Sequence, residues 1–91
     1  MLLVIAYDIV DDSQRQKLAT LLADYGQRVN YSVFECDLTP QMFSRLLTIL
    51  PTFVRQKSDR SRIYRLCGHC EEKTTAFGRL PDTKTAEIIV I

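Results

Sequence analysis

The apolar residues of this chain are continuous near its start and periodic further along. Residues 2–9 are apolar or aromatic except for one carboxylate, Asp8. Because side chains alternate across a strand, one face is expected to carry Leu3, Ile5, Tyr7 and Ile9, and the other Leu2, Val4, Ala6 and Asp8. A strand with two apolar faces is typical of a position that is covered on both sides.

Two amphipathic helices are predicted after this strand. Leucines recur at helical spacing in residues 13–25, between the helix-starting segment "DDS" and Gly26, a common residue at helix ends. The second helix is expected to begin at Thr39, since a proline follows it in the first turn, and to end or kink near Pro51.

The other apolar segments predict four more strands. Residues 28–36 alternate as one strand without a glycine or proline, and residues 62–67 form the next. Shorter candidates are residues 74–77 and the apolar segment 86–91. The expected order of strand, helix, strand, helix and three strands indicates an α+β fold with two helices on one face of a sheet.

The second face of that sheet has no helix to cover it. The simplest cover for the apolar residues of the first strand is a second copy of the chain, which predicts a homodimer. The segment "EIIVI", residues 87–91, supports this prediction, because an unpaired apolar strand favours pairing across subunits.

Length and composition fit one domain and exclude several classes of protein. The 91 residues are 46% hydrophobic, which is enough for a core and too apolar for a disordered chain. No apolar run approaches the roughly 20 residues that cross a bilayer. The start "MLLVIAYD" lacks the basic lead and cleavage site of a signal peptide, so we expect a cytoplasmic protein that enters no membrane.

Asp8 is the first candidate for chemistry, because burying an unpaired charge is costly. If the helices cover the face of Leu3, Asp8 points to the dimer interface, where two carboxylates repel unless a proton or a cation lies between them. Mg²⁺ suits such a place, since it accepts one or two carboxylates and keeps several waters. Alternatively, Asp8 caps the following helix, and the residues alone leave both interpretations open.

Basic residues are concentrated in one segment, although the net charge is only +1. Five of them lie within eleven residues: Arg55, Lys57, Arg60, Arg62 and Arg65. The segment is either a solvated loop and strand edge or a surface for phosphates. The same two interpretations apply to Arg15 and Lys17 of the first helix.

Aromatic and cysteine residues give weaker signals. Tyr31, Phe34 and Tyr64 lie on predicted strands, where rings either stack bases or, more commonly, pack in the core. The motif Cys67-Gly-His-Cys70 has the spacing of a thiol oxidoreductase or of half a zinc site, for which Cys36 and His69 are candidate further ligands. The first cysteine of the motif ends a strand, so reduced cysteines in a turn are the favoured interpretation.

Three segments in order, "YDIVDD", "YGQRVNYSVFECDLTP" and "RIYRLCGHC", resemble the CRISPR-associated protein two family, the small partner of the spacer integrase. The resemblance implies a ferredoxin-like β-α-β-β-α-β sandwich in residues 1–78, and an extra strand in residues 79–91 that crosses to the partner subunit's sheet. This plan needs two strands between the helices, so residues 28–38 must break near Tyr31 or Ser32, or form one bent strand.

The resemblance also implies an activity and a site. Members of the family are described as metal-dependent endonucleases that act on RNA or DNA. They also bridge two integrase dimers on the protospacer duplex, a role in which the nuclease centre is dispensable. Asp8 would hold one Mg²⁺ ion together with its copy in a homodimer, and Tyr7, Arg15 and Phe34 would complete the catalytic site. The expected contacts to nucleic acid are Arg15, Lys17, Arg28, Arg55, Lys57 and Arg60.

Overall fold

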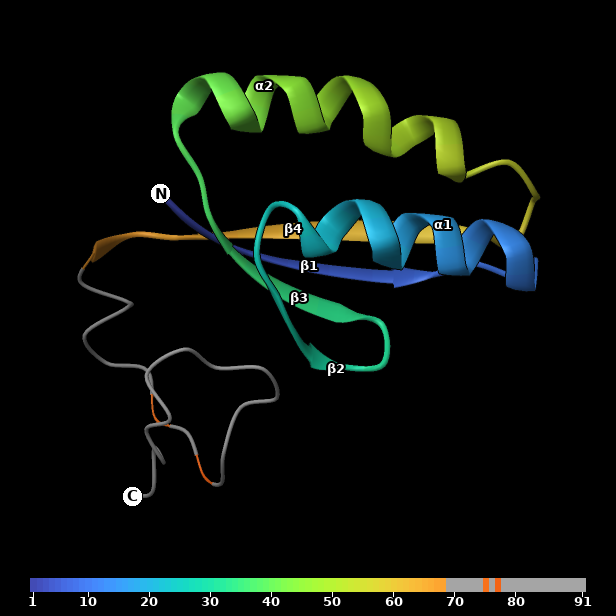
Figure 1. Ribbon diagram of the computed structural model, residues 1–91, viewed down its shortest axis with the longest axis horizontal. Helices are drawn as coiled ribbons and strands as arrows, with labels where there is room; N and C mark the ends of the chain where they lie inside the picture. The colour runs from blue at the N-terminus through green and yellow to red at the C-terminus, as the bar shows by residue number, and fades with distance from the viewer. Residues whose placement is uncertain (69–74, 76, 78–91) are drawn as a thin grey trace.

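Two helices cover one face of a four-stranded antiparallel sheet (Figure 1). The computed structural model describes residues 1–68, 75 and 77. Its elements are β1 (Leu2–Asp8), α1 (Asp12–Ala23), β2 (Gln27–Asn30), β3 (Val33–Asp37), α2 (Pro40–Ile49), the 3-10 helix η1 (Leu50–Phe53) and β4 (Arg60–Leu66). The strand order β2-β3-β1-β4 and the element order β-α-β-β-α-β are those of a ferredoxin-like sandwich, as predicted.

β1 is a central strand, and its two faces differ as the alternation predicts. On the helix side, Leu3 and Ile5 are fully buried and Tyr7 is 5% exposed. The residues between them, at positions 2, 4 and 6, are only partly buried, and Asp8 is exposed. The helices therefore cover the face of Leu3, and among residues 1–68, 75 and 77 nothing covers the other face of the strand.

Both helices begin at the residues that the sequence marks. The Asp11 carboxylate accepts a hydrogen bond from the backbone N–H of Gln14 at 2.9 Å and caps α1. The Thr39 hydroxyl caps α2 in the same way, at 3.2 Å from the N–H of Met42. The helices complete a core of Leu3, Ile5, Tyr7, Ile9, Leu18, Leu22, Phe34, Cys36, Leu38, Leu46 and Leu50.

The chain passes very close to the sheet just after the end of α1. The helix stops at Ala23, two residues before the predicted end, and Gly26 then passes directly under β3. A Cβ atom at Gly26 would lie 2.7 Å from both the Cα and the Sγ of Cys36. Glycine is required here because no side chain fits between the two backbones.

Residues 28–38 form two strands, so a single strand over 28–36 is wrong and the break required by the ferredoxin-like plan is confirmed. The turn contains Tyr31 and Ser32, and a bulge lies between Arg28 and Asn30. No glycine is needed, because the Asn30 side-chain oxygen accepts the N–H of Tyr31 at 2.8 Å. The Ser32 carbonyl in turn accepts the N–H of Tyr7 at 3.0 Å, which joins the turn to β1.

β4 begins at Arg60 and ends at Leu66, so it starts two residues before the predicted strand 62–67. Of the predicted strand 74–77, only Thr75 and Phe77 are described, and neither is in a strand. The predicted strand 86–91 and the boundary at residue 78 lie outside the described residues. Among residues 1–68, no helix is long and apolar enough to cross a membrane.

Candidate functional site

The sheet face opposite the helices, called the open face below, has an apolar centre and charged flanks. Directly opposed residues on antiparallel strands share a face, so the registers define its members. They are Leu2, Val4, Ala6 and Asp8 of β1, Val33, Glu35 and Asp37 of β3, and Arg60, Arg62, Tyr64 and Leu66 of β4. The β3 flank is acidic and the β4 flank is basic.

Asp8 lies at the end of β1 on the open face, directly opposite Arg60 of β4. It is exposed, and none of the hydrogen bonds or ion pairs of residues 1–68, 75 and 77 involves its carboxylate. The capping interpretation is not supported, because Asp11 provides the cap of α1. The Asp8 carboxylate is therefore available to a cation.

Arg15 fixes the loop that follows Asp8. Its guanidinium donates to the carbonyl of Ile9 at 2.9 Å and to that of Val10 at 3.5 Å, and it forms an ion pair with Asp12. About a third of its side chain is exposed (38%). Lys17 is exposed on the next turn of α1. Arg15 is thus positioned both to shape the strand-to-helix loop and to offer a guanidinium edge to solvent.

Arg55, Lys57 and Arg60, called the basic segment below, are all exposed before and at the start of β4. The Arg55 Nε donates to the carbonyl of Thr52 at 2.9 Å, which orients that side chain. Because Arg60 is opposite Asp8, the basic segment reaches the sheet at the same end as the candidate metal ligand. The structure therefore places two of the sequence-predicted residues, Asp8 and Arg60, opposite each other.

Asp59 is a residue of this region whose role the sequence did not reveal. It is 8% exposed, and its carboxylate accepts backbone N–H groups from Gln56 and Val10 at 2.9 Å and from Arg55 at 3.1 Å. The hydrogen bonds from Gln56 and Val10 hold the pKa of this carboxyl below its usual range. The only sequence signal was one acidic residue within a basic run.

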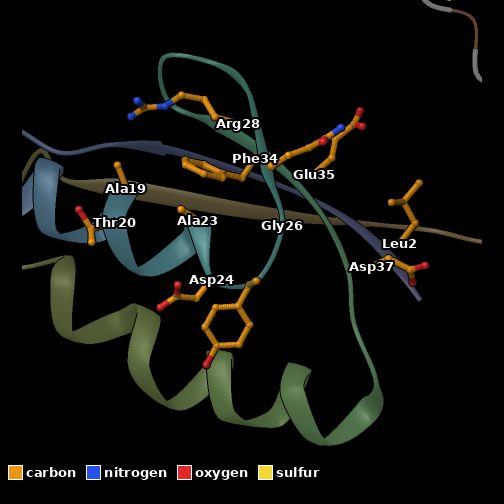
Figure 2. Close-up of a pocket in the computed structure, with 12 residues that line it drawn as sticks. Leu2, Ala19, Thr20, Ala23, Asp24, Gly26, Arg28, Phe34, Glu35 and Asp37 are labelled. Atoms are coloured by element: carbon orange, nitrogen blue, oxygen red, sulfur yellow. The ribbon is translucent and has the colours of Figure 1, made fainter. Parts of the chain in front are cut away.

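Tyr7, Phe34 and Arg28 lie on the helix side of the sheet, across from Asp8. The rings of Tyr7 and Phe34 stack with their centroids 6.3 Å apart, and the Tyr7 hydroxyl donates to the Tyr31 carbonyl at 3.4 Å. The Arg28 guanidinium lies 5.4 Å from the centre of the Phe34 ring. Figure 2 shows this pair at a groove beside α1. The core interpretation of Phe34 is confirmed.

The other predicted stacking residues and the cysteines have separate environments. Tyr31 is 85% exposed in the turn and Tyr64 is 48% exposed on the open face, so core packing is wrong for both. Cys36 is buried, and this burial raises the pKa of its thiol to about 11. Cys67 is exposed, and the other two candidate zinc ligands, at positions 69 and 70, lie outside the described residues.

Fold and site together define a small ferredoxin-like protein with one sheet face that residues 1–68 leave uncovered and that presents a carboxylate and cations at one end. Residues 1–74 match the family described as CRISPR associated protein Cas2, and the chain belongs to that family. The resemblance stated from the sequence is therefore confirmed.

Relatives match over nearly the whole chain. The chain is 43% identical over 90 residues to "CRISPR-associated endoribonuclease Cas2 3" of Synechocystis, covering 99% of this chain and 98% of the relative. It is 44% identical over 92 residues to "CRISPR-associated endoribonuclease Cas2 1" of Chloroflexus aurantiacus, covering 100% and 99%.

Solved structures match as well. Cas2 of Streptococcus pyogenes, crystallised at pH 6.5, aligns with a TM-score of 0.73 at 31% identity over 86% of this chain and 100% of that one. The hypothetical protein TT1823 of Thermus thermophilus aligns with a TM-score of 0.67 at 43% identity, over 74% and 82%.

Proposed function

We propose that this chain is a Mg²⁺-dependent endonuclease of a CRISPR system, that it works as a homodimer, and that it takes part in spacer acquisition with the CRISPR integrase. The observation that carries the proposal is the exposed Asp8 carboxylate at the end of β1, opposite Arg60. The names of the relatives, endoribonuclease or endonuclease, support cleavage of a phosphodiester in RNA or DNA.

The donor set fits Mg²⁺ when two chains each contribute Asp8. Among residues 1–68, 75 and 77, no group of three or more His, Cys, Asp or Glu side chains gathers to hold a metal. Mg²⁺ accepts one or two carboxylates and keeps several waters, so two copies of Asp8 are a sufficient set. Bound there, the ion would stabilise charge on a phosphate and lower the pKa of a water.

The charges of the open face support a dimer with this arrangement. A two-fold axis that runs along β1 would bring two copies of Asp8 together. Because β3 and β4 flank β1 on opposite sides, this axis places the β3 flank of each copy over the β4 flank of the other. At equal levels along β1, Glu35 of one copy would face Tyr64 of the other, whose hydroxyl accepts a hydrogen bond from the Arg62 guanidinium at 3.1 Å, and the apolar centres would meet.

The edge of β4 offers a second contact between copies. β4 is an edge strand of the described sheet, and an apolar groove beside it is lined by Leu47, Leu50, Pro51, Val54 and Ile63. We expect the apolar residues 86–91 of the partner copy to pair with this edge, as the family resemblance implies.

Different residues of the chain would then have different roles at the site. Asp8 holds the cation, and the basic segment binds the phosphates of the backbone next to it. Arg15 keeps the loop after Asp8 in place through its bonds to the Ile9 and Val10 carbonyls. Tyr7 and Phe34 support β1 from the helix side, and Lys17 and Arg28 stay predicted contacts for a nucleic acid that extends past the sheet.

The test is cleavage of labelled single-stranded RNA and duplex DNA by the purified protein and by Asp8→Asn. We expect the substitution to reduce Mg²⁺-dependent cleavage by at least about 100-fold, because charge stabilisation of the reacting phosphate is removed. Asp24→Asn, an exposed carboxylate at the end of α1, is the charge-matched control and retains activity. Equal cleavage by all three proteins would indicate a contaminating nuclease and refute the proposal.

A second candidate function is a non-catalytic scaffold that holds duplex DNA for the integrase. The exposure of the whole basic segment favours it. It predicts duplex binding that is indifferent to sequence, survives Asp8→Asn and weakens with salt. Neutralising the basic segment lowers the salt slope by about 0.9 for each phosphate that the protein no longer neutralises. An unchanged slope would exclude this surface from DNA binding.

A further inference from the structure

The Asp59 carboxylate joins two segments that are far apart in the sequence. One of its oxygens accepts the N–H of Val10 at 2.9 Å, across 49 positions of the chain. The other accepts the N–H groups of Arg55 at 3.1 Å and Gln56 at 2.9 Å. Hydrogen bonds to a carboxylate are stronger than those between neutral groups, so this link is firm.

Each of these two segments is next to a part of the candidate site: one follows Asp8, and the other contains the basic segment. Val10 lies two residues after Asp8, in the loop that leaves β1. Arg55 is the first residue of the basic segment, and Arg60, its last, follows Asp59 directly and is opposite Asp8. The hydrogen bonds of Asp59 therefore join the loop after β1 to the loop before β4, next to the point where Asp8 and Arg60 pair in the sheet.

Other hydrogen bonds near Asp59 connect β4 to β1 or hold each loop to its own helix, but they do not connect the two loops to each other. The Ser61 hydroxyl donates to the Ala6 carbonyl at 3.2 Å, on the strand side. Arg15 anchors the loop of Val10 to α1, and the Arg55 Nε anchors its own segment to η1. Among the hydrogen bonds of the described residues, those to Asp59 connect the loop after Asp8 to the basic segment.

We propose that Asp59 is a positioning residue that keeps Asp8 and the basic segment in one fixed arrangement, so that metal binding and phosphate binding act together on one nucleic acid. The effect of this positioning on activity rests on the proposed function. Asp59 touches neither metal nor phosphate. It acts through the backbones that carry Asp8 and Arg55.

The link itself is tested by amide hydrogen exchange of Asp59→Asn without metal or nucleic acid, with Asp24→Asn as the control of equal charge. Asparagine has the same shape but one acceptor oxygen, so it cannot bind all three N–H groups. The single oxygen can keep only one of the two segments, so we expect either the amide of Val10 or that of Gln56 to exchange at least about tenfold faster, while that of Ile5 is unchanged. Unchanged exchange at both Val10 and Gln56 would overturn the proposal.

If Asp59→Asn does not fold, hydrogen exchange of the wild-type protein still tests whether Asp59 links the two segments. Amides held by one carboxylate open together, so Val10 and Gln56 should show the same protection and the same dependence on low denaturant. Protection that differs by more than about tenfold would show that the two segments open independently, which contradicts the link.

The consequence is tested by binding of a labelled DNA duplex in Mg²⁺. We expect the contribution of Asp8, measured as the fold-difference between wild type and Asp8→Asn, to disappear in the Asp59→Asn background and to persist in the Asp24→Asn background. If Asp8 still contributes to duplex binding in the Asp59→Asn background, the proposed positioning role of Asp59 is wrong. If wild type and Asp8→Asn bind alike in Mg²⁺, the proposed metal site is wrong, and the exchange experiment alone decides whether Asp59 links the segments.

Discussion

Asp8→Asn should make the metal-free dimer more stable and remove its stabilisation by Mg²⁺. Asparagine has the size of aspartate and lacks its charge. In the structure Asp8 is exposed, and none of the hydrogen bonds or ion pairs of the described residues depends on its carboxylate. Within one chain, the free energy of unfolding should therefore change by less than about 0.5 kcal/mol.

In the dimer, repulsion between the two Asp8 carboxylates lowers stability, whereas Mg²⁺ bound between them raises it. Two carboxylates about 4 Å apart repel by about 1 kcal/mol in water and by about 4 kcal/mol at an effective dielectric constant of 20. Mg²⁺ at 100 times its dissociation constant stabilises the dimer by about 2.7 kcal/mol, or about 1.3 kcal/mol per chain.

The assay is thermal unfolding at a fixed chain concentration, because the melting temperature of a dimer depends on concentration. Saturating Mg²⁺ should raise the Tm of the wild type by about 5–10 °C and leave that of Asp8→Asn unchanged, with Na⁺ at equal ionic strength as the control. A lower Tm for the variant without metal, or an equal shift of both proteins by Mg²⁺, would refute the reasoning.

Three other predictions concern packing, the dimer and a thiol. Gly26→Ala should lower the free energy of unfolding in urea by about 1–3 kcal/mol, because its Cβ would lie 2.7 Å from the Cα of Cys36, whereas Gly68→Ala, with no atom within 4 Å of its Cβ, should be neutral. Glu35→Arg should weaken the dimer in sedimentation, and adding Arg62→Glu should restore it; a dimer indifferent to both would exclude the proposed two-fold axis. Because burial raises the pKa of Cys36 from 9.0 to about 11, its thiol should resist alkylation in the folded protein and react on unfolding. Its stabilising effect should be complete below pH 9.0 and disappear as the pH rises to about 11, which unfolding curves in that range would check.

The helices and the central strand followed from the sequence because their signals are local. The helix caps, Asp11 and Thr39, bond to N–H groups three residues away, so the pattern of nearby residues contains the whole interaction. The hairpin was harder to recognise, since its turn depends on the Asn30 side chain and on a bond from Tyr7 rather than on glycine or proline. Its break was expected only from the family resemblance.

The candidate site was predictable one residue at a time, but not as an arrangement. Asp8 and Arg60 were named separately, and only the register of β1 with β4 placed them opposite each other. Asp59 was not among the candidates from the sequence, because its three donors include an N–H group 49 positions away. Phe34 was named both as a base-stacking candidate and as a core residue, and only the packing against Tyr7 distinguished the two.

The sequence alone determined which residues are apolar, where the helices start and that Asp8 interrupts an apolar strand, since periodicity and capping act over a few residues. The tertiary structure decided which strands pair, which face stays open and which charges share one end of it. These depend on contacts between segments separated by tens of residues, and no local pattern specifies such contacts. The link through Asp59 is of this second kind.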